Sequence, residues 1–157
     1  MKMKGLTPFF RKIVLFLLCG FLYFVIEIIY RGYSHVSMFL LAGLLGVFFI
    51  DTPNNIFGFQ LDYLLQVFIS TFFCVLGEGI TGYMVNVKMG LNVWDYSRLY
   101  GSFFYGQCNI FFVIIWMLLI AFVGIPFCDA YNYYVCKDEE IPYYQILGKK
   151  IFQFPPR

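Results

Sequence analysis

The chain has 157 residues, of which 61% are hydrophobic, 23% are aromatic and only 13% are charged. Soluble domains are about 45–50% apolar and about 25% charged, so this composition excludes an ordinary soluble globular protein. The net charge at pH 7 is only +2, and no nucleic-acid partner is expected. The sequence predicts an all-α protein, a polytopic bundle of transmembrane helices that forms a single domain over residues 1–157. The partner that this composition predicts is the lipid bilayer.

Four apolar stretches are candidates for helices that cross a bilayer, which needs roughly 20 residues, and the second of them is short. They cover residues 13–30, 36–50, 61–85 and 104–125. We expect Pro53 to end the second helix and Pro126 to end the fourth, because proline has no N–H group and cannot continue a helix. Residues 126–157 then form a basic, aromatic tail that we expect to lie at the membrane surface.

Most basic residues lie near the two ends of the chain. They are Lys2, Lys4, Arg11 and Lys12 at the start and Lys137, Lys149, Lys150 and Arg157 at the finish. The positive-inside rule therefore predicts a multi-pass protein of the cell membrane with both termini in the cytoplasm. The alternative for residues 1–20 is a signal peptide, but the apolar stretch continues past Tyr23 without an A-x-A-like cleavage site. We expect a retained first helix.

The sharpest polar feature is Glu78, which lies inside an apolar stretch long enough to span a bilayer. A charged residue at a helix centre costs roughly 2.5–3.5 kcal/mol on insertion scales. Glu78 therefore either binds a proton, a cation or a cationic headgroup, or forms a structural hydrogen bond or ion pair. Glu27 interrupts the first apolar stretch near the same end, and an i, i+4 pair with Arg31 lowers the cost of both charges.

Further polar residues are expected near the same end of the bundle, and they are Thr81, Asp95, Gln107 and Asn109. Asp95 is either a second carboxylate close to Glu78 or a structural residue that caps a helix or pairs with Arg98. The third stretch also carries Gln66 and Ser70 one helical turn apart. Polar residues at helical spacing must face protein rather than lipid, so we expect this helix at the centre of the bundle.

No motif indicates catalysis or a cofactor. Gly77, Gly79 and Gly82 match G-x-G-x-x-G, but they surround a glutamate at the end of a membrane helix and do not follow a strand. Close packing explains them better. Five cysteines without a C-x-x-C pattern and a single histidine do not make a structural zinc site. We expect no enzyme activity, no metal and no cofactor.

One block of residues resembles a known family. The block is Glu78, Gly82 and Asn86, then Trp94, Asp95, Tyr96 and Ser97, then Gly106, Gln107 and Trp116. It is similar to small bacterial membrane proteins classed as ABC-transporter type IV permeases, the CmpB-like family. The likeness is best over residues 74–120, although residues 98–105 lack the proline and asparagine usual there. The resemblance implies a permease component with an ATPase partner and fixes no substrate.

Two functions from different classes follow. The first is a transport-related membrane subunit in which Glu78 and Glu27 face a polar cavity, as a homo-oligomer or beside a partner membrane subunit. The alternative is an oligomeric pore-forming or structural membrane protein such as a phage holin. A membrane enzyme that acts on lipid is third, because no nucleophile or metal set supports it.

Overall fold

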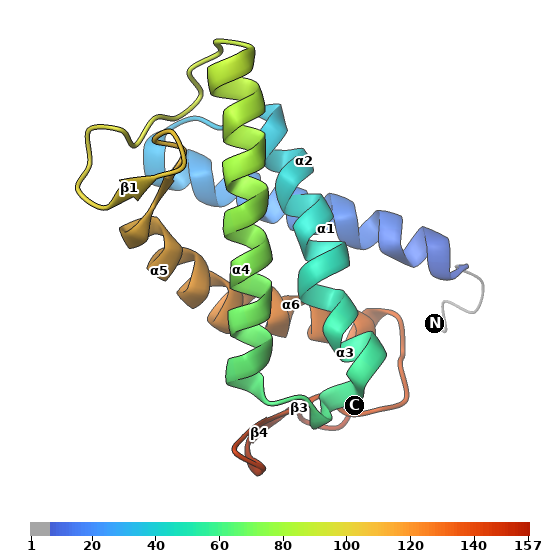
Figure 1. Cartoon of the computed structure of the whole chain (residues 1–157). Helices are drawn as coiled ribbons and strands as arrows, with labels where there is room; N and C mark the ends of the chain where they lie inside the picture. The colour runs from blue at the N-terminus through green and yellow to red at the C-terminus, as the bar shows by residue number, and fades with distance from the viewer. Residues whose placement is uncertain (1–6) are drawn as a thin grey trace.

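The computed structural model describes residues 7–157, which form four long helical runs packed against one another (Figure 1). The first run is α1 (Pro8–Arg31). The second joins α2 (Val36–Leu45), the π-helical turn η1 (Gly46–Asp51), α3 (Thr52–Phe57) and the 3-10 turn η2 (Gly58–Gln60). The third joins α4 (Tyr63–Gly82) and η3 (Tyr83–Lys88), and the fourth joins α5 (Ile110–Leu119), η4 (Ile120–Gly124), α6 (Ile125–Ala130) and η5 (Tyr131–Val135).

All four runs are long and apolar enough to cross a membrane, which confirms the predicted all-α bundle of about four spans. Each run begins after a residue whose side chain accepts a hydrogen bond from a backbone N–H of the first turn, and these caps are Thr7, His35, Asp62 and Asn109. Such caps stabilise a helix start by about 1 kcal/mol. Gly32 ends α1 in the left-handed conformation with φ 80°, as the predicted tight turn after Arg31 requires.

The two prolines expected to stop helices do not stop them, and both predictions are wrong. Pro53 lies in the first turn of α3 and Pro126 in the first turn of α6, and each follows a π-helical turn. A π turn widens the helix locally, which gives the proline ring room beside the preceding turn. The hydroxyl of Thr52 also donates to the carbonyl of Val47 at 2.7 Å. The second run therefore continues to Gln60 and the fourth to Val135.

The fourth run starts later than predicted, at Ile110 instead of near residue 104. Phe104, Tyr105 and Gly106 all have positive φ angles of 50–73°, which no α-helix accommodates. Two short strands flank them, β1 (Ser102–Phe103) and β2 (Cys108–Asn109), paired antiparallel. The connection between the third and fourth runs therefore covers residues 89–109.

After η5 the chain forms a hairpin of β3 (Tyr143–Ile146) and β4 (Lys149–Gln153), in which Ile146 pairs with Lys149. Leu147 and Gly148 connect the strands with φ angles of 50° and 75°, as a tight two-residue turn requires. The hairpin contacts η2 and the start of α4, and in Figure 1 it lies at the lower end of α4. Residues 126–135 of the predicted tail thus continue the fourth helical run, and a hairpin follows.

The closest packing joins α1 to the second run. A Cβ atom added at Gly43 would lie 2.7 Å from the ring of Phe16, and one added at Gly46 would lie 2.6 Å from the sulfur of Cys19. Small residues thus allow the two helices to approach closely at this site. The second run is also the most buried of the four, so the prediction that the third run is central is wrong.

The predicted polar face of the third run does point into protein. Gln66 and Ser70 are both buried, and the hydroxyl of Ser70 donates to the carbonyl of Phe49 at 2.8 Å. Two ends of the bundle are distinguished below. The loop end has the turn 32–35 and the connection 89–109, and the tail end has the start of α1, α3 and residues 136–157.

Candidate functional site

At the loop end, α4 places the carboxyl group of Glu78 inside the bundle, where the residue is 2% exposed. The indole N–H of Trp116 donates to Oε2 at 3.1 Å, and the hydroxyl of Tyr96 donates to Oε1 at 3.3 Å. None of the three ion pairs formed within residues 7–157 includes Glu78. Both of its oxygens are therefore held by neutral donors.

The donor from Tyr96 comes from the connection, not from a helix. Burial, and then the neighbouring Glu78, raises the pKa of Tyr96 far above its usual range. Its hydroxyl therefore keeps the proton that it donates. The ring of Tyr96 stacks on Phe112 with centroids 4.5 Å apart, which fixes the direction of the hydroxyl.

Glu27 is buried at the same end but has a cationic partner. Its Oε1 lies 2.8 Å from Arg31, the predicted i, i+4 ion pair, and its Oε2 accepts from the hydroxyl of Ser34 at 2.5 Å. Arg31 also donates to the carbonyl of Val93 at 3.4 Å. Because Arg31 is used in these contacts, it does not neutralise Glu78.

The connection brings together several residues of the block that resembles the permease family. The side-chain amide of Asn86 donates to Oε1 of Gln107 at 2.7 Å and accepts from the backbone N–H of Val93 at 2.6 Å. The indole of Trp94 donates to the carbonyl of Gln107 at 3.1 Å. Trp94 is therefore buried in protein and is not the exposed headgroup anchor that its type and position predict.

Two glycines of the block make room for this arrangement. A Cβ atom on Gly82 would lie 2.7 Å from Oε1 of Gln107 and 2.9 Å from the ring of Trp94. Gly106 has φ 73°, and a Cβ atom there would lie 2.9 Å from the backbone nitrogen of Ser97. The carbonyl of Gly106 accepts from the backbone N–H of Tyr96 at 2.7 Å. These contacts position Tyr96 beside the helices.

Other predicted site residues form no hydrogen bond with Glu78. Asp95 is exposed and accepts from the backbone N–H of Ser97 at 2.8 Å and from its hydroxyl at 3.0 Å. These bonds lower the pKa of Asp95 below its usual value. Asn109 caps α5 and donates to the carbonyl of Tyr100. Thr81 is half-buried, and its side chain makes no hydrogen bond with any residue from 7 to 157.

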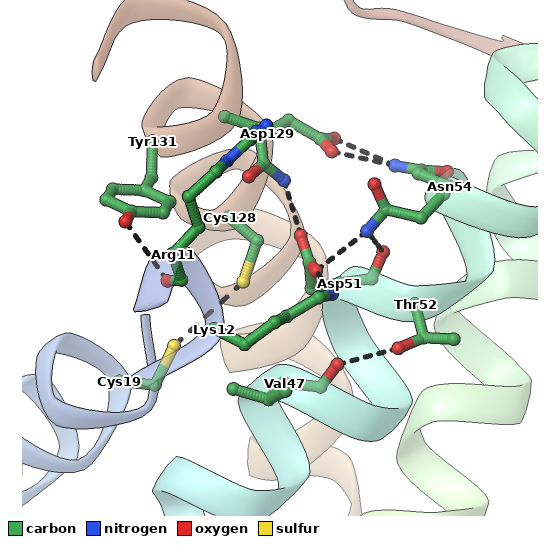
Figure 2. A network of polar contacts seen from close by, with 12 residues as sticks. Arg11, Lys12, Cys19, Val47, Asp51, Thr52, Asn54, Cys128, Asp129 and Tyr131 are labelled. Carbon is green, nitrogen blue, oxygen red and sulfur yellow. Dashed lines mark hydrogen bonds and ion pairs between the residues drawn. The ribbon is translucent and has the colours of Figure 1, made fainter. Parts of the chain in front are cut away.

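At the tail end a second polar cluster surrounds Asp51, which is 1% exposed (Figure 2). The ammonium group of Lys12 pairs with its carboxylate. The amide of Asn132 donates to Oδ1 at 2.5 Å, and that of Asn55 donates to Oδ2 at 2.7 Å. The cluster therefore joins α1, α3 and η5 through one carboxylate.

Asp129 of α6 is also buried in this cluster. The amide of Asn54 donates to both of its oxygens, at 2.9 and 3.0 Å, and the hydroxyl of Tyr144 donates to Oδ2 at 2.9 Å. Burial and the nearby Asp129 raise the pKa of Tyr144 well above its usual range, so this hydroxyl remains a donor. Over the described residues 7–157, no ion pair reaches Asp129.

The sequence alone does not indicate either tail-end carboxylate as a site residue. With helices that end at Pro53 and Pro126, Asp51 lies at the end of a helix and Asp129 lies in the tail, so neither is expected inside a membrane-length run. The signal was present, since each aspartate directly follows apolar residues, Ile50 and Cys128. An ionisable residue inside an apolar run is itself a functional indication.

An apolar cavity of about 50 Å³ lies between the two ends. Its lining includes Trp116, which binds Glu78, and Cys128, which precedes Asp129. A cavity lined by apolar groups stays dry even when a water molecule would fit. No carboxyl group lines this cavity.

Two polar hollows lie at the tail end, with volumes of about 390 and 270 Å³. The first is lined by Lys12 and Asp51, the second by Asp129, and both are lined by Asn132. Within the part of the chain from residue 7 onward, no group of three or more His, Cys, Asp and Glu side chains is arranged to hold a metal ion.

Comparisons with known proteins give no relative: no family model, no curated protein and no solved structure matches the chain.

Proposed function

We propose that the chain is a transport-related membrane subunit in which Glu78 carries a proton or a small cation. The observation that supports this proposal is the setting of Glu78, which is buried, bonded to Trp116 and Tyr96, and without an ion-pair partner in residues 7–157. A buried carboxylate without a cation is costly. Uptake of a proton or a cation removes that cost, and such groups mark ion and proton pathways in membrane proteins.

The same contrast occurs at both ends of the bundle. At the loop end Glu27 has Arg31 and Glu78 has only neutral donors, and at the tail end Asp51 has Lys12 and Asp129 has only neutral donors. We therefore assign Asp129 as the second exchanging group. Glu27 and Asp51, each with a cation, are assigned structural roles.

The apolar cavity between the ends fits a transporter better than an open pore. Its lining, which includes Trp116, Ile120 and Cys128, is apolar, and apolar constrictions close pathways by excluding water. A holin-like pore would need an aqueous lumen, which this single chain provides only through assembly with further copies.

The test of this function is ion flux in vesicles reconstituted with the purified chain. A pH-sensitive dye or a cation-sensitive dye inside the vesicles reports uptake under an imposed gradient. We expect flux with the native chain, loss of flux with Glu78→Gln, and normal flux with Asp95→Asn, a matched change at an exposed carboxylate of the same end. Flux that Glu78→Gln leaves unchanged would contradict the role of Glu78, and release of large dyes by every variant would favour the pore-forming alternative.

The permease resemblance adds a prediction about partners. A permease component needs an ATPase, and a pull-down of the tagged chain in mild detergent is expected to recover one. Recovery of the chain alone as a homo-oligomer would remove the ABC-type interpretation and leave a transporter driven by an ion gradient as the remaining form of the proposal.

A further inference from the structure

The hairpin of β3 and β4 exposes apolar and basic side chains together. Leu147 at its turn is 88% exposed, and Ile151 and Phe152 on β4 are 56% and 51% exposed. Lys149 and Lys150, between them in sequence, are exposed as well. Large exposed apolar side chains next to lysines are the composition of segments that bind at a membrane surface.

The hairpin is held firmly to the rest of the molecule. The hydroxyl of Tyr144 binds Asp129 at 2.9 Å, and its ring stacks on that of Tyr63 with centroids 4.4 Å apart. At the turn, the backbone N–H of Leu147 donates to Oδ2 of Asp62 at 2.6 Å. The exposed side chains are therefore presented on a preformed platform, which lowers the entropic cost of docking.

These contacts also place the hairpin at a particular depth. Asp62 caps the first turn of α4, where the third membrane-length run begins at Tyr63. That run has 26 residues, whereas about 20 suffice to cross the hydrocarbon core. Asp62 precedes the first residue of this run, and Leu147 is bonded to it, so the turn of the hairpin lies at the end of a membrane-length helix.

The lysines of the hairpin are available to an anion. Lys150 lies over the ring of Tyr143, 4.1 Å from its centroid, and donates to the side chain of Gln153. Neither Lys149 nor Lys150 takes part in an ion pair with a residue of the described chain. Asp62, the acidic residue at the turn, accepts from three backbone N–H groups.

We propose that the β3–β4 hairpin docks on anionic lipid headgroups, with Leu147 and Ile151 entering the interface and Lys149 and Lys150 binding the lipid phosphates, while Phe152 packs against Tyr144 and Phe154 on the other face. Each lysine near an anionic membrane surface strengthens binding about fivefold, so the pair contributes a factor of about 30. An acidic protein would satisfy the lysines but would leave Leu147 and Ile151 without a hydrocarbon partner. This inference is independent of ion transport by Glu78.

The test uses the full chain reconstituted in bilayers of zwitterionic lipid alone or mixed with phosphatidylglycerol. An environment-sensitive fluorophore is attached through Leu147→Cys, and the unsubstituted chain, treated in the same way, gives the background from native cysteines. We expect the emission to shift to the blue as phosphatidylglycerol is added. High salt should reverse part of the shift, because salt screens exposed charges beyond about 10 Å at 0.1 M.

The matched variants separate lipid binding from a general charge effect. Lys149→Gln with Lys150→Gln should lower the docking equilibrium by about 30-fold at a given lipid composition. Lys88→Gln, an exposed lysine at the loop end, should leave the shift unchanged. Emission that is the same in neutral and anionic bilayers would overturn the proposal, and so would a double variant that shifts like the native chain.

Discussion

The loop end and the tail end of the bundle hold buried carboxyl groups in different ways. At the tail end the donors to Asp51 come from three helical segments and include the ammonium group of Lys12 (Figure 2). At the loop end the donors to Glu78 are the indole of Trp116, which lies on a helix, and the hydroxyl of Tyr96, which lies in the connection 89–109.

This difference separates groups that join helices from groups that can change their partners. The donors to Asp51 lie on helical segments that pack against it, whereas Tyr96 can leave Glu78 when the connection shifts. Loops are the less stable parts of folded proteins and open more readily. The loop end is therefore a good place for exchange with the medium, whereas the contacts of Asp51 at the tail end, called the clasp below, hold helical segments together.

The largest expected effect is the loss of stability when the Asp51 clasp at the tail end loses its cation. Lys12→Met leaves the carboxylate of Asp51 buried without its cation, and loss of one partner of a buried ion pair costs about 3–5 kcal/mol. We expect a value near 3 kcal/mol, because the lysine is partly exposed. Thermal denaturation in detergent measures this change.

The control for that variant is Arg11→Met, one residue earlier. Arg11 pairs with Asp138 at 2.7 Å, but both side chains are partly exposed, and such pairs are worth about 0–1 kcal/mol. Equal destabilisation by the two variants would contradict the assignment of Asp51 to a clasp.

The next effect concerns the shape of the connection at the loop end. Gly106→Ala combines a left-handed backbone with a contact of 2.9 Å to Ser97, and strain of this kind costs about 1–3 kcal/mol. Gly90→Ala is the matched change, because φ at Gly90 is 68° but no atom lies within 4 Å. Unfolding measurements should find Gly106→Ala the more harmful of the two, and the reverse order would contradict the proposed packing around Tyr96.

A smaller effect is expected when either of the two neutral hydroxyl donors is removed. Tyr96→Phe removes a donor from Glu78 and Tyr144→Phe removes one from Asp129, and an unsatisfied buried acceptor costs about 1–3 kcal/mol. We expect Tyr144→Phe to cost more, because Tyr144 is buried whereas Tyr96 is half-buried in the connection. Tyr30→Phe, at a residue that is 69% exposed, should leave stability unchanged. Urea denaturation in mixed micelles gives the three values.

The smallest expected effect is a change in the mobility of the β3–β4 hairpin with pH. Backbone N–H donation, first from Leu147, lowers the pKa of Asp62 below its usual value. A lowered carboxyl pKa stabilises the folded form above the unfolded pKa of about 3.9, and this stabilisation is lost as the pH falls through the folded pKa. A spin label at Ile151 should become more mobile below that range. In Asp62→Asn it should be mobile at every pH, and a label that stays immobile in this variant would contradict the role of Asp62.

The sequence predicted the parts of the fold that depend on local apolar length and on spacing within one helix. The four spans and the Glu27–Arg31 pair are of this kind. It failed at Pro53 and Pro126, where preceding π-helical turns override the usual effect of proline. It also failed at residues 104–109, where three successive left-handed residues precede the helix.

The candidate site was predicted in part, for a related reason. Glu78 was visible as a charge in an apolar stretch, but its donors Tyr96 and Trp116 lie in other elements, and no spacing rule places them. The contacts of Asp51 and Asp129 are invisible in sequence because Asn54 and Asn55, adjacent in the chain, bind different carboxylates. Only the tertiary arrangement decides such pairings.

The most direct test of this account is an infrared difference spectrum of the reconstituted chain minus Glu78→Gln, recorded as the pH of the medium is varied. We predict a carboxyl band of Glu78 that converts between its protonated and ionised forms while the protein stays folded, because the group exchanges its proton with the medium. A Glu78 band that stays unchanged throughout the range of the folded protein would contradict the central claim and leave Glu78 as a structural hydrogen-bond acceptor.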